Sequence, residues 1–342
     1  MLIRNILVGI ILCHVAAVAV LAQRDWQAVF DQGLASYNAG KDLEAVDTFK
    51  RANVMRPAVP EGHYNLGLAL YRLKRYPEAV ASFREAIRLR PNYTNALVQL
   101  GTALDVSGQY AASVAAFENA LKLEPENASI WFLFAVAHES AKKYPEAEKA
   151  YLKGLAIRQD AAHGYAGYGR VLDALRREEE AAKQYQTAVK LGLEAAYLHR
   201  RVGDHYLRQK QFPDAIVSYQ IAIKLDPSSS SSYLGLGSAH FNDRKYAEAI
   251  PFYEQAVKLD PRSETGAVYL ADAYRMSKRF PDAKATYQKV LTLNAKNAEA
   301  NYWIGMIYVT EGDKTAARAY YEKLKLIDAM RAAKLLEFIS PK

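Results

Sequence analysis

The chain has 342 residues, of which 51% are hydrophobic and 24% are charged, and its formal net charge is +8. This composition is typical of a folded protein and excludes a disordered one. The basic excess is small and scattered, so it predicts weak attraction to anionic surfaces and no nucleic-acid partner. One cysteine, Cys13, excludes a disulfide framework and a CxxC site.

Residues 1–22, MLIRNILVGIILCHVAAVAVLA, differ from the rest of the chain. One basic residue, Arg4, precedes an apolar run that ends in Val20-Leu21-Ala22, ahead of polar residues. This pattern is typical of a secretory signal peptide, and we expect a periplasmic or secreted protein. Two alternatives stay open: an uncleaved membrane anchor, although the run is shorter than the roughly 20 residues that span a bilayer, and a buried N-terminal helix.

A nine-residue motif then recurs every 34 residues without an insertion. Clear copies are RYPEAVASF at 75–83, KYPEAEKAY at 143–151, QFPDAIVSY at 211–219 and RFPDAKATY at 279–287. A fixed period predicts a repeat array with one continuous core, whatever its length. The nine units are residues 26–59, 60–93, 94–127, 128–161, 162–195, 196–229, 230–263, 264–297 and 298–331.

Each unit contains two apolar stretches at helical spacing, separated by a polar turn. In unit 60–93, Leu66, Gly67 and Leu70 share one face of a first helix. Pro77 begins the second helix, where its missing N–H is harmless, and Pro91 ends it. Every unit is therefore predicted to be a pair of helices.

Residue size is constant at three positions of the unit. Position eight is glycine in seven units and alanine in two, position twenty is alanine in eight units, and position twenty-four is always Phe or Tyr. Glycine within a helix costs about 1 kcal/mol relative to alanine. Its recurrence predicts that a neighbouring side chain comes too close for a larger residue, with the aromatic ring of position twenty-four packed against small residues.

These positions, with alanine at twenty-seven and proline at thirty-two in most units, resemble the tetratricopeptide repeat over residues 26–331. The pattern departs from the family where proline is missing at position thirty-two and where position twenty-seven enlarges to Val290 and Leu324. The resemblance implies an all-α fold, a right-handed α-solenoid of helix-turn-helix repeats. Residues 332–342 are then expected to form a capping helix and tail. The apolar residues expected to cover the last unit are Leu335, Leu336, Phe338 and Ile339.

The sequence offers little catalytic chemistry. It contains no Gly-rich phosphate loop and no nucleophile elbow. The histidines, among them His138 and His199, fall mainly on packing positions and lack metal-ligand spacing. We therefore expect no catalytic residue, no metal and no cofactor.

In the tetratricopeptide family, positions two, five, six, nine, twelve and thirteen of the first helices line a concave groove. The resemblance implies a peptide in this groove, held by aromatic residues near both ends and by arginines in the middle. The aromatic and neighbouring candidates are Phe30, Tyr37, Tyr64, Asn65, Tyr71, Arg72, Tyr302 and Trp303. The basic candidates are Arg170, Arg200, Arg201 and Arg208. Arg200 and Arg201 are adjacent, about 100° apart on a helix, and need not act together.

The leading hypothesis is a non-catalytic, exported scaffold that binds a protein or peptide and assists assembly of an envelope or extracellular complex. The chaperone-binding subtype is not expected, because no unit has its lysine and asparagine pair at positions five and nine. One rival is a membrane-tethered assembly factor with the same repeats. A second rival is an enzyme whose site uses Arg170, Asp173 and Asp204 on the groove surface.

Overall fold

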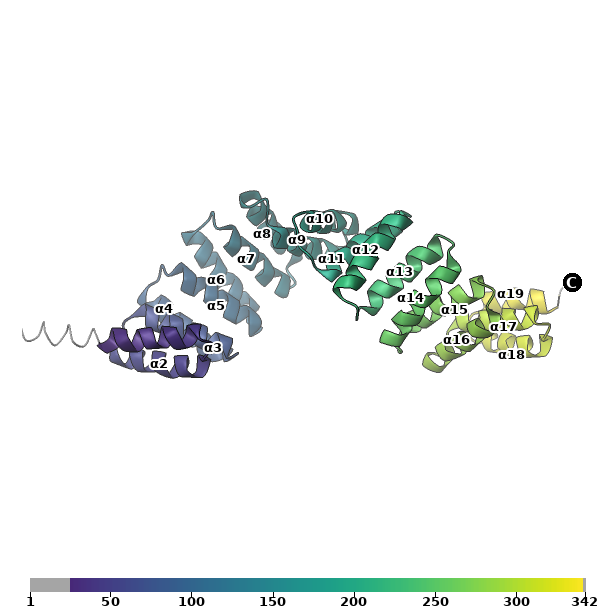
Figure 1. The fold of residues 1–342 in the computed structure, drawn as a ribbon, viewed down its shortest axis with the longest axis horizontal. Coiled ribbons are helices and arrows are strands. Elements are labelled where there is room, and N and C mark those ends of the chain that lie inside the picture. Colours follow the sequence, from purple (N-terminus) through teal and green to yellow (C-terminus); the bar gives the residue numbers. More distant parts are fainter. Residues whose placement is uncertain (1–24, 341–342) are drawn as a thin grey trace, which may run out of the picture. The chain divides into compact units, whose positions relative to one another are not determined.

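The computed structural model describes residues 25–340, and every regular element within that range is an α-helix (Figure 1). The predicted signal peptide or anchor, residues 1–22, lies outside the described residues. Residues 25–38 are helical and form the first helix of the first repeat. The other first helices are α3 (Pro60–Arg72), α5 (Thr94–Val106), α7 (Ala128–Ser140), α9 (Ala162–Ala174), α11 (Ala196–Arg208), α13 (Ser230–Asn242), α15 (Glu264–Met276) and α17 (Ala298–Thr310).

Second helices alternate with them along the chain. They are α2 (Asp42–Met55), α4 (Tyr76–Leu89), α6 (Tyr110–Leu123), α8 (Tyr144–Ile157), α10 (Glu178–Lys190), α12 (Phe212–Leu225), α14 (Tyr246–Leu259), α16 (Phe280–Leu293) and α18 (Lys314–Lys325). A final helix, α19 (Ala329–Ile339), follows α18. Four second helices carry proline within their first two residues, as Pro77 does in α4, where no backbone donor is lost.

Within the described residues the helices form two compact units, which divide between Arg176 and Arg177. Second helices pack against the first helix of their own repeat and the first helix of the next one, as α4 packs against α3 and α5 in the first unit and α12 against α11 and α13 in the second. Successive first helices also touch, as α5 touches α7 in the first unit and α13 touches α15 in the second. This consecutive packing of helix pairs is an α-solenoid, as predicted.

Aromatic rings opposite glycine hold the helix pairs together. A Cβ built on Gly67 would lie 2.5 Å from Cε1 of Phe83, and one on Gly237 would lie 2.7 Å from the Tyr253 ring. Phe83 and Tyr253 are fully buried or nearly so. The predicted packing of position twenty-four against the small position eight is confirmed in these repeats.

The turn between the two helices of a repeat has a left-handed residue at position fifteen. Lys74 has φ 60°, and the backbone N–H of Arg75 donates to Leu70 O at 2.9 Å, the six-to-one bond of a Schellman motif. Glycine serves this position in three repeats and a basic residue in six. The basic ones are Lys74, Lys142, Arg176, Lys210, Arg244 and Lys278. A left-handed backbone costs a residue other than glycine about 1–2 kcal/mol, and the sequence analysis did not anticipate it.

The C-terminal helix begins earlier than expected. α19 starts at Ala329 rather than near residue 332, because the Asp328 side chain accepts a hydrogen bond from Arg331 N at 3.0 Å and caps the helix. Leu335 and Ile339 are buried, but Phe338 is 48% exposed, so its expected role in covering the last repeat is wrong.

Candidate functional site on the first helices

The first-helix surface, defined as positions two, five, six, nine, twelve and thirteen of the first helices, carries the predicted binding residues. At its N-terminal end Phe30 is buried, with its ring stacked on Trp26 at 5.0 Å and tilted against Phe49 at 5.7 Å. The prediction that Phe30 contacts a partner is therefore wrong, because this ring fills the core of the first repeat.

Tyr37 and Arg72 lie together in the first unit. The Arg72 guanidinium is 4.4 Å from the centre of the Tyr37 ring, donates to Tyr37 O at 2.8 Å and pairs with Asp42 at 3.3 Å. Arg72 is exposed and Tyr37 half-buried, so both can still contact a partner, but the arginine is already engaged by its neighbours.

Tyr64, Asn65 and Tyr71 are half-buried residues of α3. The Tyr64 ring packs 5.0 Å from Tyr93, and burial raises the pKa of its hydroxyl. Asn65 donates to Glu61 O at 2.8 Å within its own helix. The Tyr71 ring meets Tyr76 edge-on at 5.4 Å. The partners of these three residues, Tyr93, Glu61 and Tyr76, all belong to the same repeat, residues 60–93.

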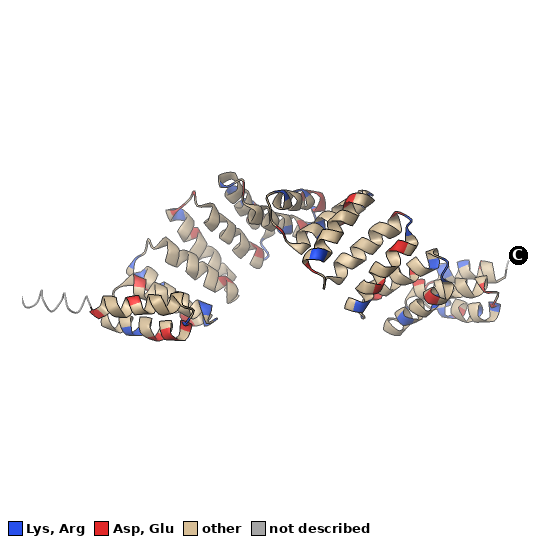
Figure 2. Cartoon of the chain, in the orientation of Figure 1, with Lys and Arg blue, Asp and Glu red and all other residues tan. Residues whose placement is uncertain are grey.

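The predicted arginines are divided between the two compact units. Arg170 belongs to the first compact unit, where its guanidinium donates to Glu139 at 3.0 Å. Arg208 belongs to the second unit and pairs with Glu178 at 3.3 Å. Figure 2 shows basic and acidic residues interspersed in both units, in agreement with the scattered charge of the sequence.

Arg200 and Arg201 both donate hydrogen bonds to the carboxylate of Asp204. Both guanidiniums reach Oδ2 of Asp204, at 3.1 Å and 3.5 Å, and the Tyr219 hydroxyl donates to Oδ1 at 2.8 Å. The expectation that two adjacent arginines diverge is therefore wrong at this site, because their long side chains converge on a residue one turn away. Both carboxylate oxygens of Asp204 therefore accept hydrogen bonds from neighbouring side chains.

At the C-terminal end Tyr302 is buried, so its predicted contact role is wrong. Its neighbour Trp303 is half-buried and packs edge-on against Tyr302 at 4.9 Å. The Arg275 guanidinium lies 3.7 Å from the centre of the Trp303 ring.

A small open cavity on the first-helix surface of the second unit was missed by the sequence analysis. We call it the α13–α15 cup; it has a volume of about 200 Å³. Its lining residues are Ser238, Phe241, Asn242, Tyr253, Tyr269 and Asp272. Five of them occupy positions six, nine, twelve and thirteen, which are among the groove positions that the family resemblance implies.

Aromatic rings and polar groups meet in this cup. The buried Tyr253 lies 5.8 Å from the Tyr269 ring and 6.5 Å from the Phe241 ring, and its hydroxyl donates to Ser238 Oγ at 3.1 Å. Burial raises the pKa of the Tyr253 hydroxyl, which stays protonated. Tyr269 is 41% exposed, so one aromatic wall of the cup is open to solvent.

Asp272 has one occupied and one available oxygen. Its Oδ1 accepts hydrogen bonds from the Tyr287 hydroxyl and from Nη2 of Arg275, the latter at 3.0 Å. No residue within 25–340 donates a hydrogen bond to Oδ2. The α13–α15 cup therefore combines three aromatic rings with an unfilled carboxylate oxygen.

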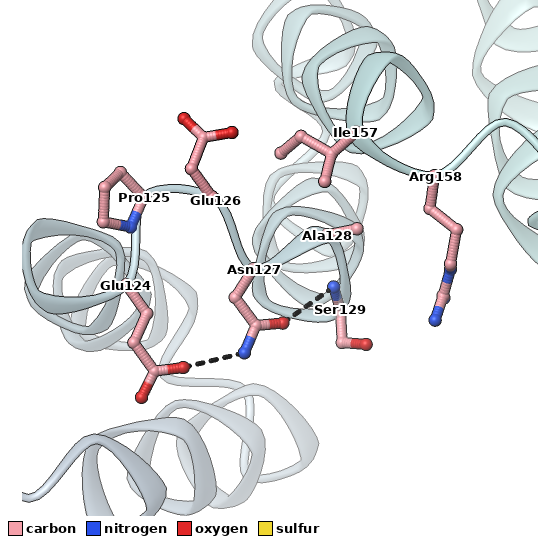
Figure 3. Close-up of a pocket in the computed structure, with 8 residues that line it drawn as sticks. All are labelled: Glu124, Pro125, Glu126, Asn127, Ala128, Ser129, Ile157 and Arg158. Atoms are coloured by element: carbon pink, nitrogen blue, oxygen red, sulfur yellow. Dashed lines mark hydrogen bonds between the residues drawn. The ribbon is translucent and has the colours of Figure 1, made fainter.

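A larger recess, of about 590 Å³, lies at the junction between α6 and α7 (Figure 3). Asn127 in this recess is already hydrogen-bonded. Its side-chain oxygen accepts from Ser129 N at 3.1 Å and caps α7, and its side-chain nitrogen donates to the Glu124 carboxylate at 2.8 Å. Arg158 lies on the other side of the recess, with its guanidinium 5.4 Å from the centre of the Phe132 ring. This recess is a product of helix capping and is a weaker binding candidate than the cup.

The buried histidines are packing residues. His138 and His199 are buried, and burial lowers the pKa of both imidazoles. Across residues 25–340 no group of three or more His, Cys, Asp or Glu side chains is placed to hold a metal ion. Within the same range no helix combines the length and apolarity needed to cross a membrane.

Comparison with known proteins gives a family match across most of the array. A family model for the tetratricopeptide repeat matches residues 98–164, 167–230, 203–264 and 270–333, which together exceed half of the chain. Two related models match residues 60–93 and 243–290. No curated protein matches this chain.

Solved structures share the fold at low sequence identity. The C-terminal part of a TPR repeat-containing protein from Cytophaga hutchinsonii is 22% identical, with a TM-score of 0.57, over 70% of this chain and 99% of that one. YrrB, described as a TPR protein with an unusual peptide-binding site, is 22% identical with a TM-score of 0.51, over 54% of this chain and 95% of YrrB. PilF from Pseudomonas aeruginosa is 18% identical with a TM-score of 0.50, over 62% of this chain and 97% of PilF.

Proposed function

The chain belongs to the tetratricopeptide repeat family, and from that premise we propose that it is a non-catalytic scaffold that binds a protein or peptide on its first-helix surface. The observation that carries the proposal is the α13–α15 cup. Its volume of about 200 Å³ suits a single side chain and not a whole small-molecule substrate. A cavity of this size on a repeat surface is an anchor point for one residue of a longer ligand.

The polar groups of the first-helix surface support binding rather than catalysis. Asp204 is filled by two arginines and a tyrosine, and Arg170 and Arg208 each pair with a glutamate. A catalytic acid or base needs access to a substrate proton, and these groups are held by their neighbours.

The proposal places the scaffold outside the cytoplasm, in assembly of an envelope or extracellular complex. This part rests on the sequence of residues 1–22, with its basic start and apolar centre. Intact mass of the protein from its native host tests it. A mass without these residues supports export and cleavage, and retention of all 22 favours the membrane-tethered alternative.

Photo-crosslinking in the native host tests the binding surface. A photoreactive phenylalanine would replace Tyr269 in the cup, and the matched control would replace Tyr110 at the start of α6. Both tyrosines are similarly exposed, at 41% and 40%, but Tyr110 lies on a second helix. We expect one partner to be captured from position 269 and not from position 110. Capture from position 110 alone, or from neither, would contradict the proposed surface.

A further inference from the structure

Three aromatic rings from three helices line the α13–α15 cup. Phe241 comes from α13, Tyr253 from α14 and Tyr269 from α15, with ring centres 5.8 Å apart for Tyr253 and Tyr269 and 6.5 Å apart for Phe241 and Tyr253. The faces of aromatic rings carry partial negative charge and attract a cation within about 6 Å. A wall of aromatic rings that presents its faces to a ligand suits a positively charged group.

The polar lining includes three hydrogen-bond acceptors. Asp272 Oδ2 accepts no hydrogen bond from any residue in the range 25–340. Ser238 Oγ accepts one bond from Tyr253 and keeps a second lone pair, and Asn242 adds an amide oxygen. Three acceptors of this kind match the three donors of an ammonium group, which has no acceptor of its own.

Arg275 leaves this acceptor set open. Its Nε and Nη2 both point to Oδ1 of Asp272, at 3.3 Å and 3.0 Å, and its guanidinium lies against Trp303. The arginine holds the carboxylate in place from one side without covering Oδ2. A carboxylate ligand would meet Asp272 with like charge, and an apolar side chain would desolvate Oδ2 without giving it a partner.

We propose that the α13–α15 cup binds the ammonium end of a lysine side chain on the partner. The rings of Phe241, Tyr253 and Tyr269 enclose the cation, and Asp272 Oδ2, Ser238 and Asn242 accept its three hydrogen bonds. This inference rests on the proposed function, because the lysine belongs to a protein or peptide that lies on the first-helix surface.

The test uses the full chain and two small probes, Nα-acetyl-lysine methylamide and its neutral analogue Nα-acetyl-norleucine methylamide. Saturation-transfer NMR measures the affinity of each. We expect weak binding of the lysine probe, and at least about tenfold weaker binding of the norleucine probe, which lacks the charge and the donors. Equal binding of the two probes would overturn the proposal.

Two aspartate variants separate binding from folding. Asp272→Asn removes the carboxylate of the cup and should weaken the lysine probe at least about tenfold. Asp204→Asn is the matched control: Asp204 stands at the same repeat position and accepts the same kind of tyrosine hydrogen bond at Oδ1, but it does not line the cup. If the control weakens the probe as much as Asp272→Asn does, the effect is structural and the proposal fails.

A third variant keeps the test independent of the aspartates. Tyr269→Leu removes an exposed wall of the cup and leaves Asp272 in place, and we expect it to weaken the lysine probe several-fold. Unchanged binding in this variant would contradict the aromatic enclosure. The crosslinking experiment distinguishes the two proposals: partner capture at position 269 without lysine selectivity overturns the cup's ligand and leaves the scaffold, whereas absence of capture overturns both, because the lysine belongs to the partner.

Discussion

The repeats of α11 and α15 each have an aspartate at the same position, but its second carboxylate oxygen is occupied in α11 and, within the described residues, unoccupied in α15. Asp204 and Asp272 both stand at position nine, and each accepts a hydrogen bond at Oδ1 from the tyrosine at position twenty-four, Tyr219 or Tyr287. In α11 two arginines fill the other oxygen, whereas in α15 that oxygen stays open beside a cavity.

The difference comes from two residues of the first helix that lie about one turn before the aspartate. Positions five and six are Arg200 and Arg201 in α11, but Val268 and Tyr269 in α15. The packing of aspartate on tyrosine is kept while residues one turn earlier decide whether the carboxylate is closed or available. Binding capacity in this array is thus set by surface positions over a constant core.

The largest expected effect tests the core that the two repeats share. A Cβ on Gly203 would lie 2.9 Å from Cε1 of Tyr219, the ring that hydrogen-bonds Asp204. In Gly203→Val the ring must move, and we expect the free energy of unfolding to fall by about 1–3 kcal/mol in urea titrations. The control Thr265→Val, at an exposed position of α15, should change it by less than about 0.5 kcal/mol. An unchanged midpoint for Gly203→Val would show that the core does not need the glycine.

The next prediction converts the open site into the closed one. Tyr269 and Asp272 have the same i,i+3 spacing as Arg201 and Asp204, which form an ion pair. The variant Tyr269→Arg should fill Oδ2 of Asp272 and weaken the Nα-acetyl-lysine methylamide probe about tenfold, or about 1.4 kcal/mol. Thr265→Arg places the same charge elsewhere on α15 and serves as the control. Retained affinity in Tyr269→Arg would break the comparison, because it would show that Oδ2 is not the site of binding.

A smaller effect, of opposite sign, is expected at the turns of both repeats. Lys210 and Lys278 have φ 60°. Relief of left-handed strain of about 1–2 kcal/mol, less the entropy that glycine adds to the unfolded chain, should leave Lys210→Gly and Lys278→Gly each more stable by about 0.5–1 kcal/mol. Thermal or urea unfolding measures the gain. Because the two turns are alike, a gain in only one of them would mean that the repeats differ in more than their surface.

The smallest effect depends on pH and concerns the repeat of α11. Burial lowers the pKa of His199, whereas position four of α15 is Ala267. As pH falls below about 6.5, the unfolded chain takes up a proton that folded His199 resists, so stability decreases. The variant His199→Gln should flatten the fall in stability between about pH 6.5 and pH 5. His163→Gln, at an exposed position, is the control, and an equal change in both variants would assign the effect elsewhere.

The fold followed from the sequence because its determinants are local and repeated. The glycine of position eight and the aromatic ring of position twenty-four lie in one repeat, so their contact, as between Gly67 and Phe83, could be predicted from spacing alone. The last repeat is different. There the side chain that a Cβ on Gly305 would meet first is Leu335 of α19, at 2.6 Å, and not the aromatic ring of its own repeat. An end of the array has no following repeat, and the capping helix takes that place.

The binding surface was harder to predict because exposure depends on neighbours. Phe30 and Tyr302 stand at the same position as the half-buried Tyr64, yet both are buried. Asp204 and Asp272 likewise stand at the same repeat position, yet Arg201, three residues before Asp204, donates to Oδ2, whereas Arg275, three residues after Asp272, donates to Oδ1. Side-chain directions of this kind are set in three dimensions and leave no periodic signal.

The basic residues at position fifteen have a further consequence. Six exposed turns present lysine or arginine at intervals of 34 residues or a multiple of it, and trypsin cleaves after these residue types. Cleavage within a tight turn requires local opening of its repeat. Limited digestion should therefore yield a ladder of fragments with a step of one repeat, and the rungs that disappear when a partner is added would mark the repeats it covers. The turns thus provide regularly spaced cleavage sites, from which the repeats that a partner covers can be identified.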